Sequence, residues 1–367
     1  MKILILDTYY PAFLDDFYHR YPTISDEKYE DQLQALLNQQ FGTADFYSKN
    51  LRLLGHEAKD IIYNAESLQN KWAQEHNIHF KYNITEIIPI LYRYLQKRWP
   101  ERILLDQIKN YQPDILYIQN VSVLSSGFLY RIKPSLKMLV GQIASPFDSK
   151  IDLSVYDLLI SAAPNFVQHF RQRGYASERL KIGFESTILS QLKKNRITWN
   201  TIFIGGFTGP HLKTTRLLEK VAVEVPIDFW GYDAYNLDHD SPIRQRFHGP
   251  VWGVEMYSVL HNSKIAINRH VDEAENYAGN MRIYEVTGTG TLLITDMKDN
   301  LGELFKIGEE IETYSSPEEL IAKIKFYSHN ESARQKIAHA GQQRTLKDHN
   351  YYQRMKELIQ ILKRYTP

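Results

Sequence analysis

The sequence predicts an α/β protein with two domains, each built around a mainly parallel sheet. Short apolar runs alternate with amphipathic helical patterns along the whole chain, which is typical of βαβ units. The alternation starts afresh near residue 196, after the polar stretch SQLKKNRITWN. A chain of 367 residues is also long enough for two domains of ordinary size. We therefore expect one domain over 1–195, a second over 196–350, and a terminal helical segment over 351–367.

In the first half, each expected element has its own local signal. The opening run KILILD, closed by Asp7, is typical of a buried parallel strand. One helical pattern ends at Gly42 and the next at Gly55. The later elements are an extended segment around Ile61, a helix in PERILLDQIKN, strands in DILYIQN, LKMLVGQIA and YDLLISA, and a helix in NFVQHFRQRG.

The second half repeats this alternation. The expected strands are TIFIGGF, IDFWGYD, KIAIN and TLLITD, and the expected helices are HLKTTRLLEKVAVEV, VEMYSVLHNS, NMRIYE and RMKELIQILKRY. SSPEELIAKIKFYS opens with Ser316, Pro317 and Glu319, the pattern of a capping box. Two such sheets facing each other form a cleft at the carboxyl ends of their strands, where ligands bind.

Composition excludes several classes of function. Lys+Arg 44 against Asp+Glu 43 leaves a formal charge of +1, so no bulk field attracts nucleic acid. The absence of cysteine excludes a disulfide scaffold, a Cys-ligated zinc site and a thiol nucleophile. The run MKILILD is too short for a signal peptide, and no 18 apolar residues run together. We expect a cytoplasmic protein, with peripheral membrane contact as an open alternative.

Several catalytic and binding motifs are absent or out of context. GTGTLL, from Gly288, lacks the strand that precedes a dinucleotide-binding loop. The Asp238-x-Asp240 pair matches the spacing of a metal site but lies in a polar loop, so we expect no metal. The chain has no H-E-x-x-H, G-x-S-x-G or P-loop motif. These absences argue against zinc-hydrolase, α/β-hydrolase and P-loop NTPase chemistry.

Polar residues and glycines follow each strand of the predicted second sheet. After the first strand, FIGGFTGPHLK supplies Gly205, Gly206, His211 and Lys213, and the next strand is followed by FWGYD and HGPVWG. After a third strand, INRHVD supplies Asn268, Arg269, His270 and Asp272. The segment NMRIYE then adds Arg282 and Glu285. Helix N-termini at such an edge attract phosphate groups. Taken singly, the glycines suit turns, and Arg282 with Glu285 suits a surface salt bridge. Taken together, they favour a ligand site. The glycine-rich corner after Glu285 is either a phosphate-binding loop or a packing corner.

From about Thr201 to His349 the chain resembles the second half of group-1 (GT4-like) glycosyltransferases, most closely the CgeB-like branch. MRIYEVTGTGTLLITD is similar to the pattern R-x-[FY]-E-x-x-x-x-G followed by a lLiTD strand, and His349 and Arg354 match the closing motif. FGTADFYSKNLRLLGHEAKDIIYN resembles the acceptor-side domain. The resemblance implies the GT-B fold, with two Rossmann-like domains facing across a cleft. It also implies a C-terminal helix over 351–367 that crosses back to the first domain.

The resemblance implies roles for residues of the second domain. Glu285 would bind the ribose hydroxyls of a nucleoside diphosphate sugar, and the corner's backbone would lie beside the diphosphate. Lys213, with His211 or Arg282, would neutralise the leaving diphosphate. If the reaction inverts, a base must come from the cleft, and the candidates are Asp272 and Asp148 of SPFDSK. The implied donor-binding residues are Gly205, Gly206, Phe207, Gly231, Tyr232, Pro250, Val251, Asn268, Arg269, Glu285, Val286, Thr287 and Gly288.

Two positions depart from the family pattern. Tyr277 stands where many members have the first glutamate of E-x7-E, and Phe207 replaces the arginine of G-R-x5-K. The expected function is a metal-independent, retaining transferase with no cofactor, which uses a UDP-, GDP- or dTDP-linked sugar. Its acceptor is an unidentified glycan, lipid, protein or small molecule. The alternatives are an epimerase or hydrolase of nucleotide sugars, and a non-catalytic binding protein.

Overall fold

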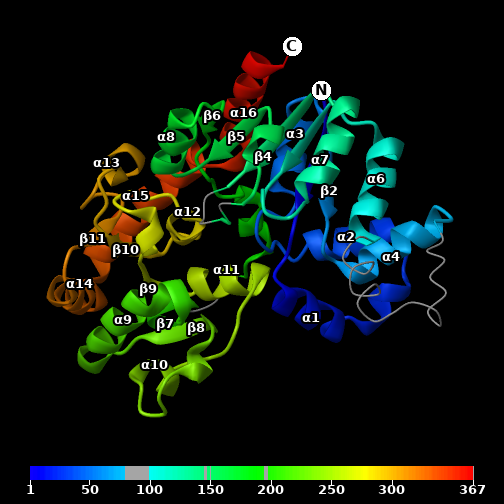
Figure 1. Ribbon diagram of the computed structural model, residues 1–367. Coiled ribbons are helices and arrows are strands. Elements are labelled where there is room, and N and C mark those ends of the chain that lie inside the picture. Colours follow the sequence, from blue (N-terminus) through cyan, green and yellow to red (C-terminus); the bar gives the residue numbers. More distant parts are fainter. Residues whose placement is uncertain (79–98, 144–146, 149, 194–196, 367) are drawn as a thin grey trace. The chain divides into compact units, whose positions relative to one another are not determined.

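The computed structural model describes residues 1–78, 99–143, 147–148, 150–193 and 197–366 (Figure 1). The chain forms two compact units. Unit 1 comprises Met1–Ser161, Val167–Glu178 and Met355–Pro367, and unit 2 comprises Ala162–Phe166 and Arg179–Arg354. Each unit is built around its own sheet, which confirms the predicted α/β class. The predicted boundary at residues 195 and 196 lies outside the described residues.

Unit 1 contains a six-stranded sheet in the order β2-β1-β3-β4-β5-β6. Its strands are β1 (Lys2–Asp7), β2 (Glu57–Ile62), β3 (Ile115–Ile118), β4 (Met138–Gln142), β5 (Leu158–Ser161) and β6 (Ser177–Arg179). β1 pairs in parallel with β2 and β3, and the parallel pairing continues through β4 to β5. The helices that precede residue 178 are α1 (Pro11–Arg20), α2 (Tyr29–Leu37), α3 (Phe46–Leu53), α4 (Glu66–Glu75), α6 (Trp99–Tyr111), α7 (Ser126–Ile132) and α8 (Pro164–Gln172).

Unit 2 contains a five-stranded sheet in the order β11-β10-β9-β7-β8, and its neighbouring strands are parallel. The strands are β7 (Trp199–Gly206), β8 (Asp228–Tyr232), β9 (Ser263–Asn268), β10 (Leu292–Asp296) and β11 (Glu312–Tyr314). The helices are α9 (Leu212–Glu224), α10 (Pro242–Gln245), α11 (Gly253–His261), α12 (Met281–Gly288), α13 (Leu301–Leu304), α14 (Pro317–His329), α15 (Glu331–Asp348) and α16 (Tyr351–Tyr365), whose later part belongs to unit 1.

The apolar core of unit 2 fixes which helices cover which face of the sheet. Leu218 and Val221 of α9 and Leu320 and Ile324 of α14 pack in one core with alternate residues of β7, β9 and β10. α11 and α12 contact the same strands without joining this core. Because all the strands of this sheet are parallel, their carboxyl ends lie at one edge of the sheet. The loops that lead to α9, α11 and α12 gather at this edge.

The predicted capping box forms at the start of α14. The Ser316 hydroxyl accepts a hydrogen bond from the Glu319 N–H at 3.2 Å, and Glu319 in turn accepts one from the Ser315 N–H at 2.8 Å. Two N–H groups that no helical carbonyl can reach are thereby satisfied. In a capping box the Glu319 carboxylate would accept from the N–H of the N-cap residue, Ser316. Here it accepts from the N–H of Ser315, one position earlier.

The segment before residue 196 differs from the predicted division of the chain. Its described residues from Arg179 onward belong to unit 2. A β-bridge joins Phe184 to Asn350, and the Arg354 side chain donates to the Ile182 carbonyl at 3.2 Å. These contacts attach the segment to the end of α15 and the start of α16, although the sequence places it before the second run of strands.

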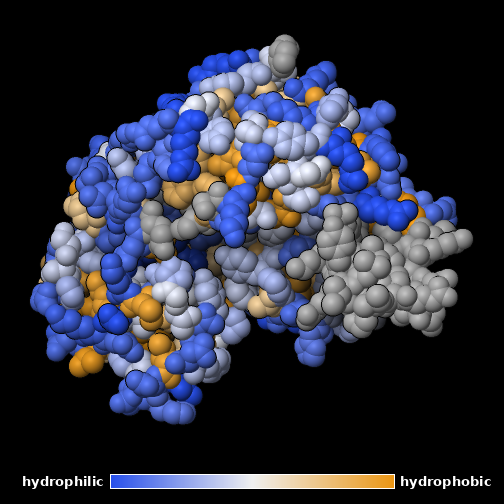
Figure 2. All heavy atoms as spheres, in the orientation of Figure 1, coloured by the Kyte–Doolittle hydropathy of each residue, from blue (hydrophilic) through white to orange (hydrophobic). Residues whose placement is uncertain are grey.

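The surface drawn in Figure 2 is largely hydrophilic, with hydrophobic side chains in separate patches. Large exposed apolar side chains, such as Leu53, Val223 and Phe326, come from different helices. Among the helices that the structure describes, none is long and apolar enough to span a bilayer.

Candidate functional site

The carboxyl ends of β7 and β8 are shaped by glycines. Gly231 has a φ of +131°, and a Cβ there would overlap the carbonyl of Gly205. A Cβ on Gly206 would meet the rings of Tyr232 and His211 at 2.5 and 2.6 Å. The Tyr232 hydroxyl lies 3.4 Å from His211 Nε2. The structure therefore brings these five predicted residues together because only glycine lets the strands end this closely.

Pro250 and Val251 lie just beyond the same edge. Residues 247–249 run beside β8, where the Gly231 N–H donates to the Gly249 carbonyl at 3.0 Å. Pro250 is exposed, and Val251 is buried. The pair thus directly follows Gly249, which is hydrogen-bonded to the strand end that carries Tyr232, as a base-binding role requires.

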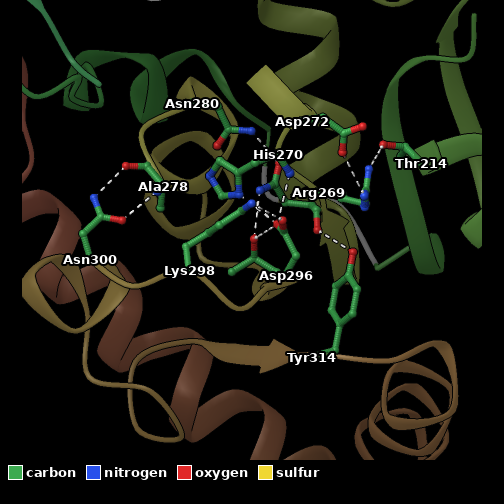
Figure 3. A network of polar contacts seen from close by, with 12 residues as sticks. Thr214, Arg269, His270, Asp272, Ala278, Asn280, Asp296, Lys298, Asn300 and Tyr314 are labelled. Carbon is green, nitrogen blue, oxygen red and sulfur yellow. Dashed lines mark hydrogen bonds and ion pairs between the residues drawn. The ribbon is translucent and has the colours of Figure 1, made fainter. Parts of the chain in front are cut away.

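Two cations at the ends of β7 and β9 share one carboxylate. Lys213, in the first turn of α9, lies 2.8 Å from Asp272, and Arg269 lies 3.4 Å from the same side chain. Arg269 also donates to the Thr214 hydroxyl at 2.9 Å (Figure 3). The predicted residues Lys213, Arg269 and Asp272 therefore form one network, with more positive than negative charge.

The environment of Asp272 does not suit a catalytic base. The hydrogen bond from Lys213 and the charges of Lys213 and Arg269 hold its pKa below the ordinary value. A carboxylate so stabilised has little tendency to take a proton at neutral pH. We therefore revise its predicted role from base to counter-ion.

A second network joins the ends of β9 and β10. His270 Nδ1 lies 2.8 Å from the Asp296 carboxylate, which also accepts the His270 backbone N–H at 3.0 Å. Lys298 lies 3.5 Å from the other Asp296 oxygen. Asn268 donates to Thr295 at 2.9 Å and accepts from Asn280 at 2.8 Å (Figure 3).

α12 begins beside this second network, and the described residues leave several of its first N–H donors without an acceptor. Asn280 is its N-cap residue, and its side chain makes no capping bond to the helix. The N–H groups of Met281, Arg282 and Ile283 have no acceptor among the described residues. Such an end carries about half a positive charge and attracts anions.

Glu285 lies one turn further along α12 and is already engaged. It is 6% exposed and pairs with Arg282 at 2.8 Å. Burial, followed by the charge of Glu285, raises the pKa of the neighbouring Tyr257 well above its ordinary value. Tyr257 is therefore a neutral hydroxyl facing a carboxylate. A ribose bound here would have to share Glu285 with Arg282.

The corner that follows Glu285 is a packing corner, which corrects the diphosphate interpretation. Val286, Thr287 and Gly288 are buried inside α12, where helical hydrogen bonds use their N–H groups. A Cβ on Gly288 would overlap the Phe184 ring, and Thr287 bonds the Thr345 hydroxyl at 2.6 Å. The corner also precedes β10. It therefore lies at the amino edge of the parallel sheet, opposite the edge that carries Lys213.

Phe207 is likewise part of the core. Its side chain is fully buried, against Phe203, Phe229 and Phe247. Its carbonyl accepts a hydrogen bond from the Thr215 hydroxyl at 2.8 Å. Contact with a ligand through the Phe207 side chain is excluded by this packing.

Sequence reasoning missed three polar residues of the site, Asn280, Asp296 and Lys298, and assigned no role to His270. One signal was available, because Asp296 ends the apolar run LLIT, as Asp7 ends KILIL. Within the described part of the chain, no three His, Asp or Glu side chains are grouped closely enough to hold a metal ion.

Part of the sequence matches a known protein family, and the whole fold matches known structures. Residues 213–360 match the family model described as glycosyl transferase-like. No curated protein matches the chain in sequence. A glycosyltransferase from Rickettsia africae matches in structure with a TM-score of 0.59 and 13% identity, over 99% of this chain and 98% of that chain.

Two further solved structures match over nearly their full length. Anabaena Alr3699/HepE in complex with UDP and glucose matches with a TM-score of 0.60 and 12% identity, over 99% of this chain and 100% of that chain. Sucrose-phosphate synthase from Thermosynechococcus elongatus matches with a TM-score of 0.60 and 10% identity, over 99% of both chains. The chain therefore has the GT-B fold, and the match to the glycosyl transferase-like family lies in its second half.

Proposed function

We propose that the chain is a glycosyltransferase of the group-1, CgeB-like kind. It transfers a sugar from a UDP-, GDP- or dTDP-linked donor to an acceptor hydroxyl, with retention of configuration and without a metal. The proposal rests on one observation. At one edge of the unit 2 sheet, two cationic side chains lie near α12 N–H groups that have no acceptor among the described residues. This edge belongs largely to the segment that matches the glycosyl transferase-like family.

The diphosphate of the donor fits this edge by charge. Lys213 and Arg269 now share the single carboxylate of Asp272, and a diphosphate would take its place between them. The N-terminus of α12 would bind further phosphate oxygens. As the bond to the sugar breaks, negative charge grows on the phosphate, and fixed cations stabilise it. The loss of one such group costs about 3–4 kcal/mol of barrier.

The same edge has surfaces for the nucleoside. Glu285 would accept hydrogen bonds from the ribose hydroxyls, and Tyr232, Pro250 and Val251 would flank the base. His211 lies against Tyr232, and its imidazole would lie beside the phosphates.

The state of Asp272 favours retention. An ion-paired carboxylate with a lowered pKa is a poor base. In the proposed reaction the acceptor oxygen bonds the anomeric carbon on the face that the phosphate leaves. The proton of the acceptor hydroxyl passes to a phosphate oxygen, and the products are the glycoside and the nucleoside diphosphate.

Ligand binding tests this proposal. We would measure thermal unfolding of the wild type with UDP, GDP, dTDP, CMP and NAD, and repeat it with Glu285→Gln and Glu285→Ala. A ligand at 100 times its Kd stabilises by about 2.7 kcal/mol, a shift of several degrees. We expect a shift with one nucleoside diphosphate that is smaller in both variants. Absence of a shift with every nucleotide would refute the proposal.

Turnover separates the alternatives. UDP-glucose is the first donor to try, because Anabaena Alr3699/HepE, which matches this chain in structure, has been solved in complex with UDP-glucose. A transferase consumes the donor quickly only when an acceptor is present. Rapid donor conversion without an acceptor would favour an epimerase or hydrolase. Donor binding without turnover across a broad acceptor panel would favour a binding protein.

A further inference from the structure

One imidazole nitrogen in the described part of unit 2 is buried and has no hydrogen-bond partner there. His270 follows β9, and the residue is 2% exposed. Its Nε2 atom is sheltered from solvent and has no hydrogen-bond partner among the described residues. An unsatisfied buried polar group costs about 1–3 kcal/mol. Because an unsatisfied buried nitrogen lowers stability, its presence indicates a hydrogen-bond partner from a bound ligand.

The other imidazole nitrogen defines what Nε2 can do. Nδ1 lies 2.8 Å from Asp296 Oδ1, and Lys298 lies 3.5 Å from Oδ2. Burial alone would raise the pKa of Asp296, but the hydrogen bonds from the His270 ring and backbone, together with Lys298, hold it below the ordinary value. An ionised carboxylate only accepts hydrogen bonds, so Nδ1 carries the proton. In the neutral ring Nε2 is then an acceptor.

A second buried acceptor lies nearby, at the start of α12. Asn280 Nδ2 donates to Asn268 Oδ1, and Asn268 Nδ2 donates to the Thr295 hydroxyl. This run of donors fixes which way the Asn280 amide points. Its Oδ1 atom is buried and has no partner among the described residues. Figure 3 shows the side chains of Asn280 and His270, and both residues follow β9 in the chain.

We infer that His270 Nε2 and Asn280 Oδ1 accept hydrogen bonds from hydroxyls of the sugar carried by the donor. This inference rests on the proposed function. Sugar hydroxyls donate hydrogen bonds, whereas ionised phosphate oxygens only accept them. The α12 N–H groups are donors and suit the diphosphate. The two orphaned acceptors therefore suit the part of the ligand next to the diphosphate.

A matched pair of His270 variants tests the inference. In His270→Asn the amide can keep the donor to Asp296 while Nε2 is removed. In His270→Gln the amide reaches toward the Nε2 position. Isothermal titration would compare UDP with UDP-glucose, or the corresponding pair for whichever base the wild type binds. For His270→Asn we expect UDP binding within twofold of wild type and UDP-glucose binding at least tenfold weaker. For His270→Gln we expect part of the sugar affinity to return.

The outcomes separate this inference from the proposed function. If the wild type binds neither a nucleoside diphosphate nor its sugar conjugate, the proposed function fails, and the inference fails with it. If the wild type binds both and His270→Asn weakens both equally, or neither, only the inference is overturned.

A measurement on the wild type covers the case in which the variants do not fold. The ¹⁵N resonance of His270 Nε2 should move when UDP-glucose is added and stay in place when UDP is added. Equal responses to the two ligands would overturn the inference.

Discussion

Replacing Asp272 by Asn should strengthen the binding of a nucleoside diphosphate. In the structure Asp272 lies 2.8 Å from Lys213 and 3.4 Å from Arg269, and its side chain is 42% exposed. An exposed ion pair contributes about 0.2–1 kcal/mol, and a ligand that displaces Asp272 must break both pairs. Removing the carboxylate charge should therefore improve binding by about 1 kcal/mol, or roughly fivefold in Kd.

Isothermal titration at low and at moderate ionic strength measures this effect. The gain should shrink as salt rises, because exposed charges are screened over about 8–10 Å at physiological ionic strength. Asp299→Asn is the matched control. It removes the same charge from an exposed position in unit 2, and Asp299 forms no ion pair with another described residue. Equal or weaker binding by Asp272→Asn, or an equal gain in the control, would refute the counter-ion role.

Three further predictions concern the stability of unit 2. Phe207→Ala should destabilise the fold by about 3–5 kcal/mol, because it removes a fully buried ring, and denaturant unfolding measures this loss. Gly231→Ala should also destabilise, because its φ is +131° and a Cβ would overlap the Gly205 carbonyl; a lowered Tm measures this effect. The third concerns acid. Burial, with the charges of Arg354 and Arg344, lowers the pKa of His349 to about 4. The folded pKa is depressed, so protonation favours the unfolded chain, and the stability contributed by neutral His349 is lost as the pH falls from about 6.5 to about 4. Unfolding free energies measured across this range should fall less steeply for His349→Gln.

Each of these predictions has an outcome that contradicts it. Near-wild-type stability of Phe207→Ala would mean that the ring does not fill the core. An unchanged Tm of Gly231→Ala would mean that β7 and β8 do not end in the tight arrangement described. An identical acid profile for His349→Gln would assign the acid sensitivity to other groups.

Local sequence patterns predicted the elements because their causes are local. KILILD, TIFIGGF and TLLITD form strands since each is an apolar run of strand length with turn residues beyond it. The capping box at Ser316 forms because its partners are three residues apart. The order of strands and helices then requires parallel sheets, since adjacent strands are joined through helices.

The glycine corner shows where a local pattern was insufficient. Gly288 and Gly290 suit a phosphate loop and a packing corner equally well, because both need backbone without a side chain. Position in the fold separates them. The corner leads into β10, so it lies at the amino edge of a parallel sheet. Phe207 is a similar case, since its direction toward the core depends on the helices packed over β7.

The sequence by itself determined the class of fold, the order of the elements and the edge of the second sheet at which polar residues gather. Tertiary structure alone decided which of those residues meet. Lys213 and Asp272 are far apart in the chain, and so are His270 and Asp296. Ion pairs and orphaned acceptors depend on side chains brought together by strand pairing and helix packing. The local periodicity of apolar residues in the sequence does not predict those contacts.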